Sequence, residues 1–403
     1  MKCTTSGLKV CLCIVLFLMA PGLMFASSVT VDCIGVAPGT FTTITAALAS
    51  MSHTDSNFIF VTCNPSENVV IGGFSNLSIN AVPGTATVIS ADPNRRVLFI
   101  NESTGVFIDG LSFIGGRGVF INNSRNVQLG DGGISNSTAI GLTSLNSTVD
   151  LFGSSPTSLF IIQNSTRSGV SAQGGTLSLD GGVTVNNNGR LGVVMSTGHL
   201  QLNGGDGGVS IPDNIISNNG ATGVEVAGTA ELDAFGGNSI LNNGSDETLA
   251  PSFGLVAIHT STAIWSGGTI SKHNGAGVHI GETSHGEFDT VDITQNDGNG
   301  VEITDHSDAY FDGGVNVSSN AGFGTLVDLS SVLNSLGGNT INTNTSVGYV
   351  VNDLSIIKFA ANDTVTGNGK FALECANGSL VVGDISTYKP KKCGVGFQAT
   401  PLP

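Results

Sequence analysis

Charged residues are scarce in this chain. Lys, Arg, Asp and Glu together make up 11% of the 403 residues, whereas soluble domains usually contain about 25%. Hydrophobic residues nevertheless account for 40%, so Asn, Ser, Thr and Gly have to cover the surface. Acidic residues outnumber basic ones by 30 to 14. This imbalance argues against nucleic acid or another polyanion as a loosely held partner, because nonspecific binding of such chains needs a basic surface.

Long hydrophobic runs are equally rare. One run, from Val10 to Phe25, follows Lys2 and Lys9 and precedes several small residues. This arrangement is typical of a secretory signal peptide, and we expect residues 1–27 to be removed. An uncleaved anchor is the alternative, although the run is short for a membrane span. Because no second run occurs, we expect a soluble, secreted protein in the extracellular space or at the cell surface, with no membrane partner.

Cysteine is sparse as well. Three of the seven cysteines lie in the signal segment, and the other four form two close pairs near the ends of the chain, Cys33 with Cys63 and Cys375 with Cys393. In an oxidising compartment these pairs predict two disulfides, one at each terminus. No Cys-x-x-Cys spacing occurs, so we expect no metal site built on cysteine.

The feature that the chain does have is a repeat. Val278 and Val301 are 23 residues apart, and each ends a segment with the same pattern of glycines. A mostly apolar residue that follows a Gly recurs at intervals of 23 to 31 residues, and we call these residues the markers: Val119, Leu142, Val170, Val193, Val224, Leu255, Val278, Val301, Thr325 and Tyr349. So short a unit cannot bury a hydrophobic face alone, which predicts stacked coils that share one core.

The pattern within one repeat predicts how each coil is built. The marker and the second residue after it are mostly apolar while the residue between them faces outward, as in a strand with one buried side. The Gly before each marker indicates a tight turn. Five residues before the marker lies a second column, which predicts side chains hydrogen-bonded from coil to coil: Asn188, Asn219, Ala250, His273, Asn296, Asn320 and Asn344. We interpret His273 as part of this ladder rather than as a catalyst. Three short strands fit in each repeat, which predicts a parallel β-helix of about ten to eleven coils.

The start of the mature chain has a different pattern. Apolar residues at i, i+3, i+4 and i+7 predict one short helix that ends near Met51, with Thr43 as a possible N-cap. Short runs rich in β-branched residues follow at 58–61, 67–71 and 77–81. The helical segment, the run at 67–71 and the repeated Asn-x-Gly-x-Gly-Val turns resemble the right-handed parallel β-helix, or pectin lyase-like, superfamily.

The resemblance implies an all-β, right-handed parallel β-helix over about residues 30–390, with a short capping helix at its N-terminal end. The regions expected are an N-terminal cap with the first coils at 28–95, repeats at 96–370 and a C-terminal cap at 371–403. Members of the superfamily include polysaccharide lyases, hydrolases and esterases, and also secreted proteins with no assigned role. Fold alone does not decide among them.

Motifs of the enzyme families in this superfamily are missing. The sequence has no Asn-Thr-Asp or Arg-Ile-Lys segment, Gly198-His199-Leu200 lacks the second Gly of a Gly-His-Gly motif, and no pectinesterase-type Asp or Arg segment occurs. Lys272 is almost the only basic residue in the acidic middle of the chain. Abstraction of a proton from a polyuronate is therefore the least expected chemistry, and we lean towards a protein without enzymatic activity.

Acidic and His residues cluster in the coils that follow the markers Val224, Leu255, Val278 and Val301. Residues at equal distances from their markers are expected to lie one strand spacing apart, which stacks Asp289 directly on Asp312. Two carboxylates so close would raise the pKa of one of them and act as acid and base in glycoside hydrolysis, assisted by His285. The alternative is a solvated acidic surface that keeps the solenoid soluble.

Further residues of the same coils are candidates for substrate binding: Trp265, His279, Glu287, Glu302, Asp308 and Tyr310. The two aromatic side chains could stack on sugar rings, and packing in the core would account for them equally well. We expect no cofactor. Ca²⁺ held by Asp289, Asp305, Asp308 and Asp312 has no supporting loop spacing.

Two functions are open at this point. One is a monomeric, secreted protein that binds or processes polysaccharide, by glycoside hydrolysis if it is an enzyme. The other is a non-catalytic surface β-helix that acts as an adhesin or spacer. A groove walled by the inserted loop near residues 239–252 would favour the first, and a flat acidic face would favour the second.

Overall fold

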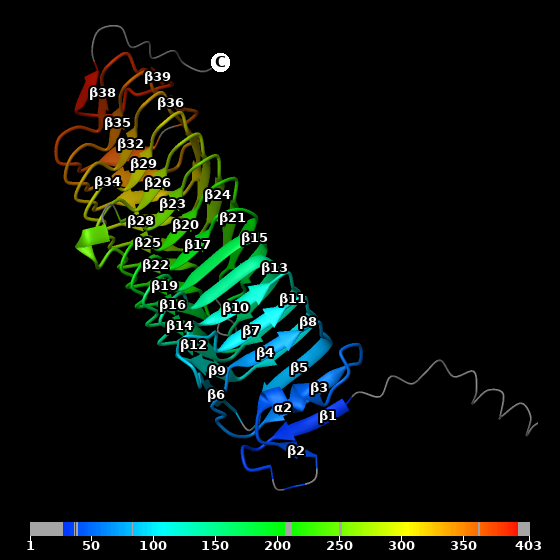
Figure 1. The fold of residues 1–403 in the computed structure, drawn as a ribbon. Coiled ribbons are helices and arrows are strands. Elements are labelled where there is room, and N and C mark those ends of the chain that lie inside the picture. The colour runs from blue at the N-terminus through cyan, green and yellow to red at the C-terminus, as the bar shows by residue number, and fades with distance from the viewer. Residues whose placement is uncertain are drawn as a thin grey trace, which may run out of the picture.

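The computed structural model describes residues 27–393, apart from 36, 38, 83, 206–211, 250–251 and 362. Residues 1–26 and the last ten residues lie outside the described residues. The predicted signal segment 1–27 therefore falls outside them except for Ser27, and the signal peptide stays a prediction. Between these limits the chain forms an elongated stack of coils that runs from the N-terminal end to the C-terminal end (Figure 1). The stack is a parallel β-helix of about 13 turns. The markers predicted ten to eleven turns, because the first and last coils lack the Gly-marker pattern.

Strands of successive coils pair in parallel register and form three faces. The first face begins at the markers and contains β4 (Val69–Gly72), β7 (Leu98–Asn101), β10 (Val119–Asn122), the start of β13 (Leu142–Phe152) and of β15 (Val170–Leu179), β17 (Val193–Met195), β20 (Val224–Val226), β23 (Leu255–Ala257), β26 (Val278–Ile280), β29 (Val301–Ile303), β32 (Thr325–Val327), β35 (Tyr349–Val351), β38 (Leu373–Cys375) and β40 (Lys391–Cys393).

The second face follows the first within each coil. It contains β1 (Ser27–Val31), β3 (Asn57–Val61), β5 (Ser75–Ala81), β8 (Thr104–Asp109), β11 (Arg125–Gly130), the ends of β13 and β15, β18 (His199–Asn203), β21 (Glu231–Phe235), β24 (Thr262–Ser266), β27 (His285–Asp289), β30 (Asp308–Gly313), β33 (Val332–Ser335), β36 (Ile356–Phe359) and β39 (Leu380–Val382). A short strand, β2 (Thr40–Phe41), pairs with β1 at the N-terminal end.

The third face is a separate sheet of 12 strands. It contains β6 (Ala86–Ile89), β9 (Leu111–Ile114), β12 (Gly133–Ser135), β14 (Phe160–Gln163), β16 (Val183–Asn186), β19 (Ile215–Ser217), β22 (Ser239–Leu241), β25 (Thr269–Ser271), β28 (Asp292–Thr294), β31 (Asn316–Ser318), β34 (Thr340–Asn342) and β37 (Thr364–Thr366). Inward side chains of all three faces fill one continuous apolar core along the axis.

The predicted helix is α2 (Ile44–Ala49), which packs against the first coils. The Thr43 side chain accepts a hydrogen bond from the Ala46 amide and so caps the helix, as predicted. Glu67 adds a second cap, because its carboxylate accepts from the amides of Ile44 and Thr45 at 2.6 and 2.9 Å. Both predicted disulfides are present, Cys33–Cys63 at the start of the stack and Cys375–Cys393 at its end.

The predicted ladder of side chains runs along one corner of the coil. The Asn320 side chain donates to Asn344 at 2.9 Å, and the Asn296 side chain donates to Asn320 at the same distance. The prediction that Ala250 belongs to the ladder is wrong, because Asn243 takes that place. The Asn243 side chain accepts a hydrogen bond from the Asn219 side chain at 2.9 Å. The inserted residues of this coil lie between Asn243 and its marker, and Ala250 itself is outside the described residues.

His273 takes its place in the ladder as predicted. Its Nδ1 accepts from the Asn243 amide and its Nε2 donates to the Ile240 carbonyl, both at 3.1 Å. The ring is buried, and burial lowers the pKa of His273 to about 4. A neutral imidazole therefore replaces an amide in the interior of the corner.

Candidate functional site

The strands β21, β24, β27 and β30 bring most of the predicted site residues onto one surface. His285 lies beside Asp308 in the neighbouring strand, and Glu287 lies beside Tyr310. This register is the one that the marker spacing predicted. We call the outward side chains of these strands the acidic face: Glu231, Asp233, His285, Glu287, Asp289, Asp308, Tyr310 and Asp312.

Histidine–carboxylate pairs connect neighbouring coils in this region. His285 Nδ1 lies 2.8 Å from a carboxylate oxygen of Asp308 on the acidic face. His279 Nδ1 lies 3.1 Å from Glu302 on the first face. Both pairs are partly exposed. Each fixes the orientation of two side chains that the sequence placed in one column, and each leaves hydrogen-bonding atoms facing solvent.

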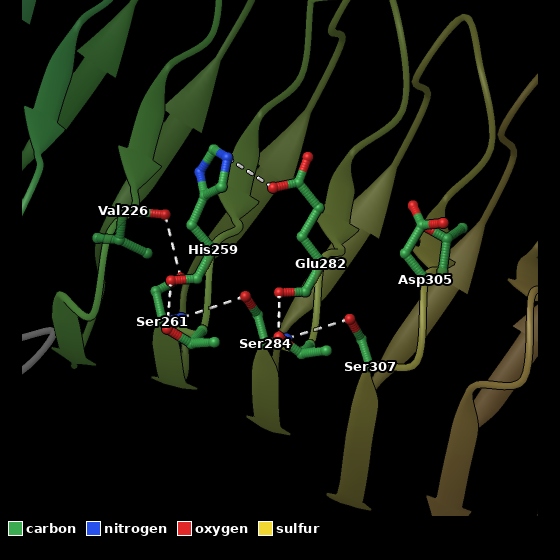
Figure 2. Close-up of polar contacts among 10 residues, drawn as sticks. Val226, His259, Ser261, Glu282, Ser284, Asp305 and Ser307 are labelled. Carbon is green, nitrogen blue, oxygen red and sulfur yellow. Dashed lines mark hydrogen bonds and ion pairs between the residues drawn. The ribbon is translucent and has the colours of Figure 1, made fainter.

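A third pair lies at the corner between these two faces. His259 Nε2 is 2.7 Å from Glu282, and Asp305 follows on the next coil (Figure 2). His259 and Glu282 have left-handed backbone angles, with φ of 58° and 56°, which lets the chain turn sharply here. A buried serine ladder holds the corner in register: the Ser261 amide donates to Ser284 Oγ and the Ser284 amide to Ser307 Oγ, each at 3.2 Å.

The prediction that Asp289 stacks on Asp312 is wrong. The register shifts between Phe288 and Asp289, so Asp289 pairs with Gly313 and Asp312 is the additional residue. The Asp289 carboxylate instead accepts a hydrogen bond from Ser266 Oγ at 3.1 Å. This coil has one residue more than the coil before it, and a β-bulge in β30 contains the additional residue.

The carboxylates that do interact are those of Glu287 and Asp312. The pKa of Glu287 is raised, first by a hydrogen bond with Asp312, then by partial burial and by the charge of Asp312, while the charge of His285 opposes these effects. Two carboxyl groups in hydrogen-bonding contact share a proton more readily than they hold two charges. The acidic face thus contains a carboxylate pair, but Asp312 interacts with Glu287 instead of with Asp289, the predicted partner.

Trp265 does not lie on the surface, and its predicted role in stacking on sugar is wrong. The side chain is 1% exposed and its indole N–H donates to the Gly267 carbonyl at 2.7 Å. Its strand neighbour is Phe288, another core residue. Tyr310 is the aromatic residue of the acidic face, 36% exposed, with its ring centre 5.7 Å from that of His285.

The inserted loop borders a depression on the first face. A hollow of about 550 Å³ lies between β17, β20 and η1 (Glu247–Leu249), lined by Arg190, Leu191, Ala221, Thr222, Glu225, Thr248 and Leu249. Partial burial raises the pKa of Glu225, while the charge of His259 opposes that effect. Sequence reasoning missed this residue as a candidate because the path of the inserted loop carries no sequence signal. The hollow lies over the first face and leaves the acidic face unwalled by these residues. By the criterion given above, this arrangement counts against a substrate groove on the acidic face and favours a non-catalytic protein.

Within residues 27–393 as described, no group of three or more His, Cys, Asp or Glu side chains is placed to hold a metal ion. None of the helices in that part of the chain is long and apolar enough to cross a membrane.

Comparisons with known proteins gave only distant similarities. No protein-family model and no curated protein matches the sequence. The A-module of mannuronan C-5 epimerase AlgE4 from Azotobacter vinelandii has a TM-score of 0.49 at 12% identity, with 86% of this chain and 91% of that chain covered. The A-module of AlgE6 from the same organism has a TM-score of 0.42 at 13% identity, with coverages of 89% and 97%.

A further solved structure is the catalytic domain of a GH87 α-1,3-glucanase. It has a TM-score of 0.35 at 14% identity, covering 95% of this chain and 69% of that chain. Scores and identities this low carry no information about the activity of this protein, so its function has to be argued from its own residues.

Proposed function

We propose that this protein is secreted and binds a neutral extracellular polysaccharide along the acidic face, without cleaving it. The inserted loop does not wall this face, so the proposal is carried by the fixed orientation of its side chains. His285 is held by Asp308, Glu287 by Asp312, and Asp289 by Ser266. Polar side chains fixed before the ligand arrives lose little freedom on binding, which favours affinity. Tyr310 adds an exposed ring that can stack on a sugar.

The spacing of the face supports a linear ligand. Equivalent side chains recur at each strand, about 4.8 Å apart, which is close to the length of one sugar residue in an extended chain. Carboxylates accept hydrogen bonds from hydroxyl groups, and a neutral imidazole can both donate to a hydroxyl group and accept from one. Since the face has several carboxylates and no basic residue other than its histidines, it would repel an acidic polysaccharide. A neutral chain therefore fits it best.

The geometry of the carboxylates favours binding over hydrolysis. Glycosidases hold their two carboxyl groups about 5 to 9.5 Å apart so that the glycosidic bond, or a water molecule, fits between them. Glu287 and Asp312 are in hydrogen-bonding contact. A sugar chain would have to separate them before either could attack. If the protein does cleave its ligand, glycoside hydrolysis by this pair is the expected reaction.

The test is a screen of the mature protein on a glycan array, together with a reducing-sugar assay on the glycans that bind. We expect binding to neutral glycans and no release of reducing sugar. The double variant Glu287→Gln, Asp312→Asn should weaken binding at least tenfold. The matched control is Asp150→Asn, Asp180→Asn, which changes a second pair of neighbouring carboxylates and should leave affinity within about twofold.

The possible results separate the alternatives. No binding to any neutral glycan, or an equal loss in the control variant, would refute the proposal and favour the spacer or adhesin role. Release of reducing sugar by the unchanged protein but not by the Glu287, Asp312 variant would show that it is a hydrolase.

A further inference from the structure

The arginines of this protein are confined to one part of the chain. All six lie between residues 95 and 190, whereas every lysine of the mature chain lies at 272 or later. Five of the six follow one edge of the stack, next to the first face, and we call them the arginine edge: Arg95, Arg96, Arg117, Arg167 and Arg190.

Backbone hydrogen bonds show that this edge is continuous. The Arg117 amide donates to the Arg95 carbonyl at 2.8 Å, and the Arg190 amide donates to the Arg167 carbonyl at 3.1 Å. Between these two steps lies the coil of Ala139, whose carbonyl accepts from the Arg167 amide. Four of the five successive coils thus carry arginine at this position. With about 4.8 Å per coil, the row is about 19 Å long.

One carboxylate, that of Glu225, lines the same hollow as Arg190 at one end of the row, but no ion pair found among residues 27–393 as described includes an arginine. Arg95, Arg117, Arg167 and Arg190 are exposed. Arg96 is half-buried, and its pKa is lowered by burial and by the charge of Arg117. Like charges gathered along one edge without ion pairs to acidic side chains favour an anionic ligand.

An aromatic platform lies beside one end of the row. The rings of Phe99 and Phe120 stack with centroids 5.4 Å apart, and the Arg96 guanidinium lies 5.1 Å from the centre of the Phe120 ring. Both rings are partly exposed on the first face, and Val70 beside them is 46% exposed. Of the two rings, that of Phe99 lines a hollow of about 260 Å³, together with Asn68, Val70, Asn94, Arg95, Arg96 and Arg117. An apolar floor with a cationic rim suits a ring that carries an acidic group.

Solubility alone does not account for this choice of residue. Lysine or glutamate would keep the edge hydrated equally well. The arginine guanidinium is planar, binds carboxylate or sulfate with two parallel hydrogen bonds, and stacks on aromatic rings. Both uses are available here, since Arg96 already packs on Phe120 and the exposed arginines occupy equivalent backbone positions in neighbouring coils.

We propose that the arginine edge, with Phe99 and Phe120, is a binding site for an acidic polysaccharide, distinct from the acidic face. The acidic groups of the sugar chain pair with the arginines of successive coils, and one sugar ring packs on the aromatic platform. Single-stranded nucleic acid is a poorer fit, because proteins that bind it place aromatic side chains under successive bases. Here the next coils present Thr143 and Ser171 at the corresponding positions.

This site changes the conclusion drawn from net charge. An excess of acidic residues argues against a polyanion only when the charges are mixed over the surface. At physiological ionic strength, exposed charges are screened beyond about 8 Å. A ligand on the arginine edge therefore responds chiefly to the arginines beside it, and the acidic face in the later coils contributes little.

The experiment is calorimetric titration of the mature protein with oligomers of galacturonate. Neutral dextran oligomers of similar length and a single-stranded DNA oligomer serve as comparison ligands. We expect galacturonate oligomers of about four residues or more to bind more tightly than the monomer, dextran to bind at least tenfold more weakly, and affinity to fall as salt rises. The variant Arg95→Gln, Arg117→Gln should bind galacturonate at least tenfold more weakly than the unchanged protein.

A matched control is available in Arg125→Gln, because Arg125 is exposed but lies on β11 of the second face, away from the row. It removes one of the six arginines and should change affinity less than twofold. Phe120→Ala should weaken binding while leaving the salt dependence unchanged. Three results would overturn the proposal. The Arg95, Arg117 variant could bind galacturonate as tightly as the unchanged protein does, the unchanged protein could fail to bind galacturonate, or DNA could bind more tightly than galacturonate. None of these results depends on the acidic face.

Discussion

His273 is the one imidazole among the asparagine side chains of the described ladder. The positions on either side of it are Asn243 and Asn296. Its ring accepts from a backbone amide of one neighbouring coil and donates to a carbonyl of that coil, as the Asn243 side chain does. A buried imidazole can be charged only at a cost, which lowers the pKa of His273 to about 4. In the unfolded chain the same ring has a pKa of about 6.5.

This difference predicts a pH-dependent loss of stability. Above pH 6.5 the ring is neutral in both states and contributes no pH dependence. As pH falls below 6.5, the unfolded chain binds a proton that the folded chain does not, so stability falls until about pH 4. Between pH 7 and pH 5 the loss from this group is about 2 kcal/mol.

His273→Asn tests the prediction, because it restores the residue found in neighbouring coils. Denaturant unfolding at pH 7 and pH 5 should show a smaller decrease for the variant than for the unchanged protein. His306→Asn serves as the control, since His306 is exposed, and it should keep the original pH dependence. An identical decrease in all three proteins would mean that the ring is not kept neutral by burial.

Single residues also show where the sequence was informative and where it was not. Trp265 lies ten residues after its marker, in the same column as Phe288 and Phe311, and these two are core residues. The alternation of the strand therefore contained the signal that Trp265 is buried, although its rarity suggested a binding role. In contrast, nothing in the sequence shows that Asn243 rather than Ala250 joins the ladder, because residue spacing does not show where in a coil an insertion is placed.

At the scale of the strand, the acidic pair on β27 and β30 depends on the bulge. Asp312 is the extra residue of β30, and this shift places its carboxylate next to Glu287 rather than Asp289. The pKa of Glu287 is raised chiefly by that contact.

Asp312→Asn should therefore lower the pKa of Glu287 towards its usual value, as measured by NMR titration of the side-chain carboxyl. Asp289→Asn is the matched control, because Asp289 is hydrogen-bonded to Ser266 instead, and it should change the titration of Glu287 much less. A larger effect from Asp289→Asn would mean that the predicted direct stacking of Asp289 and Asp312 describes the protein better than the bulged register.

The strands show which parts of the strand register the repeat spacing predicts. The Gly before each marker and the apolar residues after it predicted the paired columns of the first face, and Val278 does lie beside Val301. The same counting failed at the end of β30, because the interval from Val301 to the next marker is 24 residues rather than 23. A count reveals that one residue is extra, but local packing decides that it is Asp312.

At the scale of the whole molecule, each coil contacts mainly its neighbours, so stability is expected to be local. The Cys33–Cys63 disulfide closes a loop of 30 residues at the N-terminal end. Removing it as Cys33→Ser, Cys63→Ser should destabilise that end by about 4 kcal/mol on the chain-entropy estimate. Hydrogen exchange should accelerate in β1, β3 and α2, and should be unchanged in β26 and β29. Uniform acceleration along the chain would indicate that the solenoid unfolds as one cooperative unit.

The parallel ladders also decide how the molecule responds to mechanical force. Their hydrogen bonds run along the axis of the stack, so a pull on the two ends loads them one coil at a time instead of all together. Each coil that peels away releases about 23 residues, or about 80 Å of extended chain. The terminal disulfides keep the outermost segments from being drawn out to full length. The protein should therefore lengthen stepwise under tension, one coil at a time.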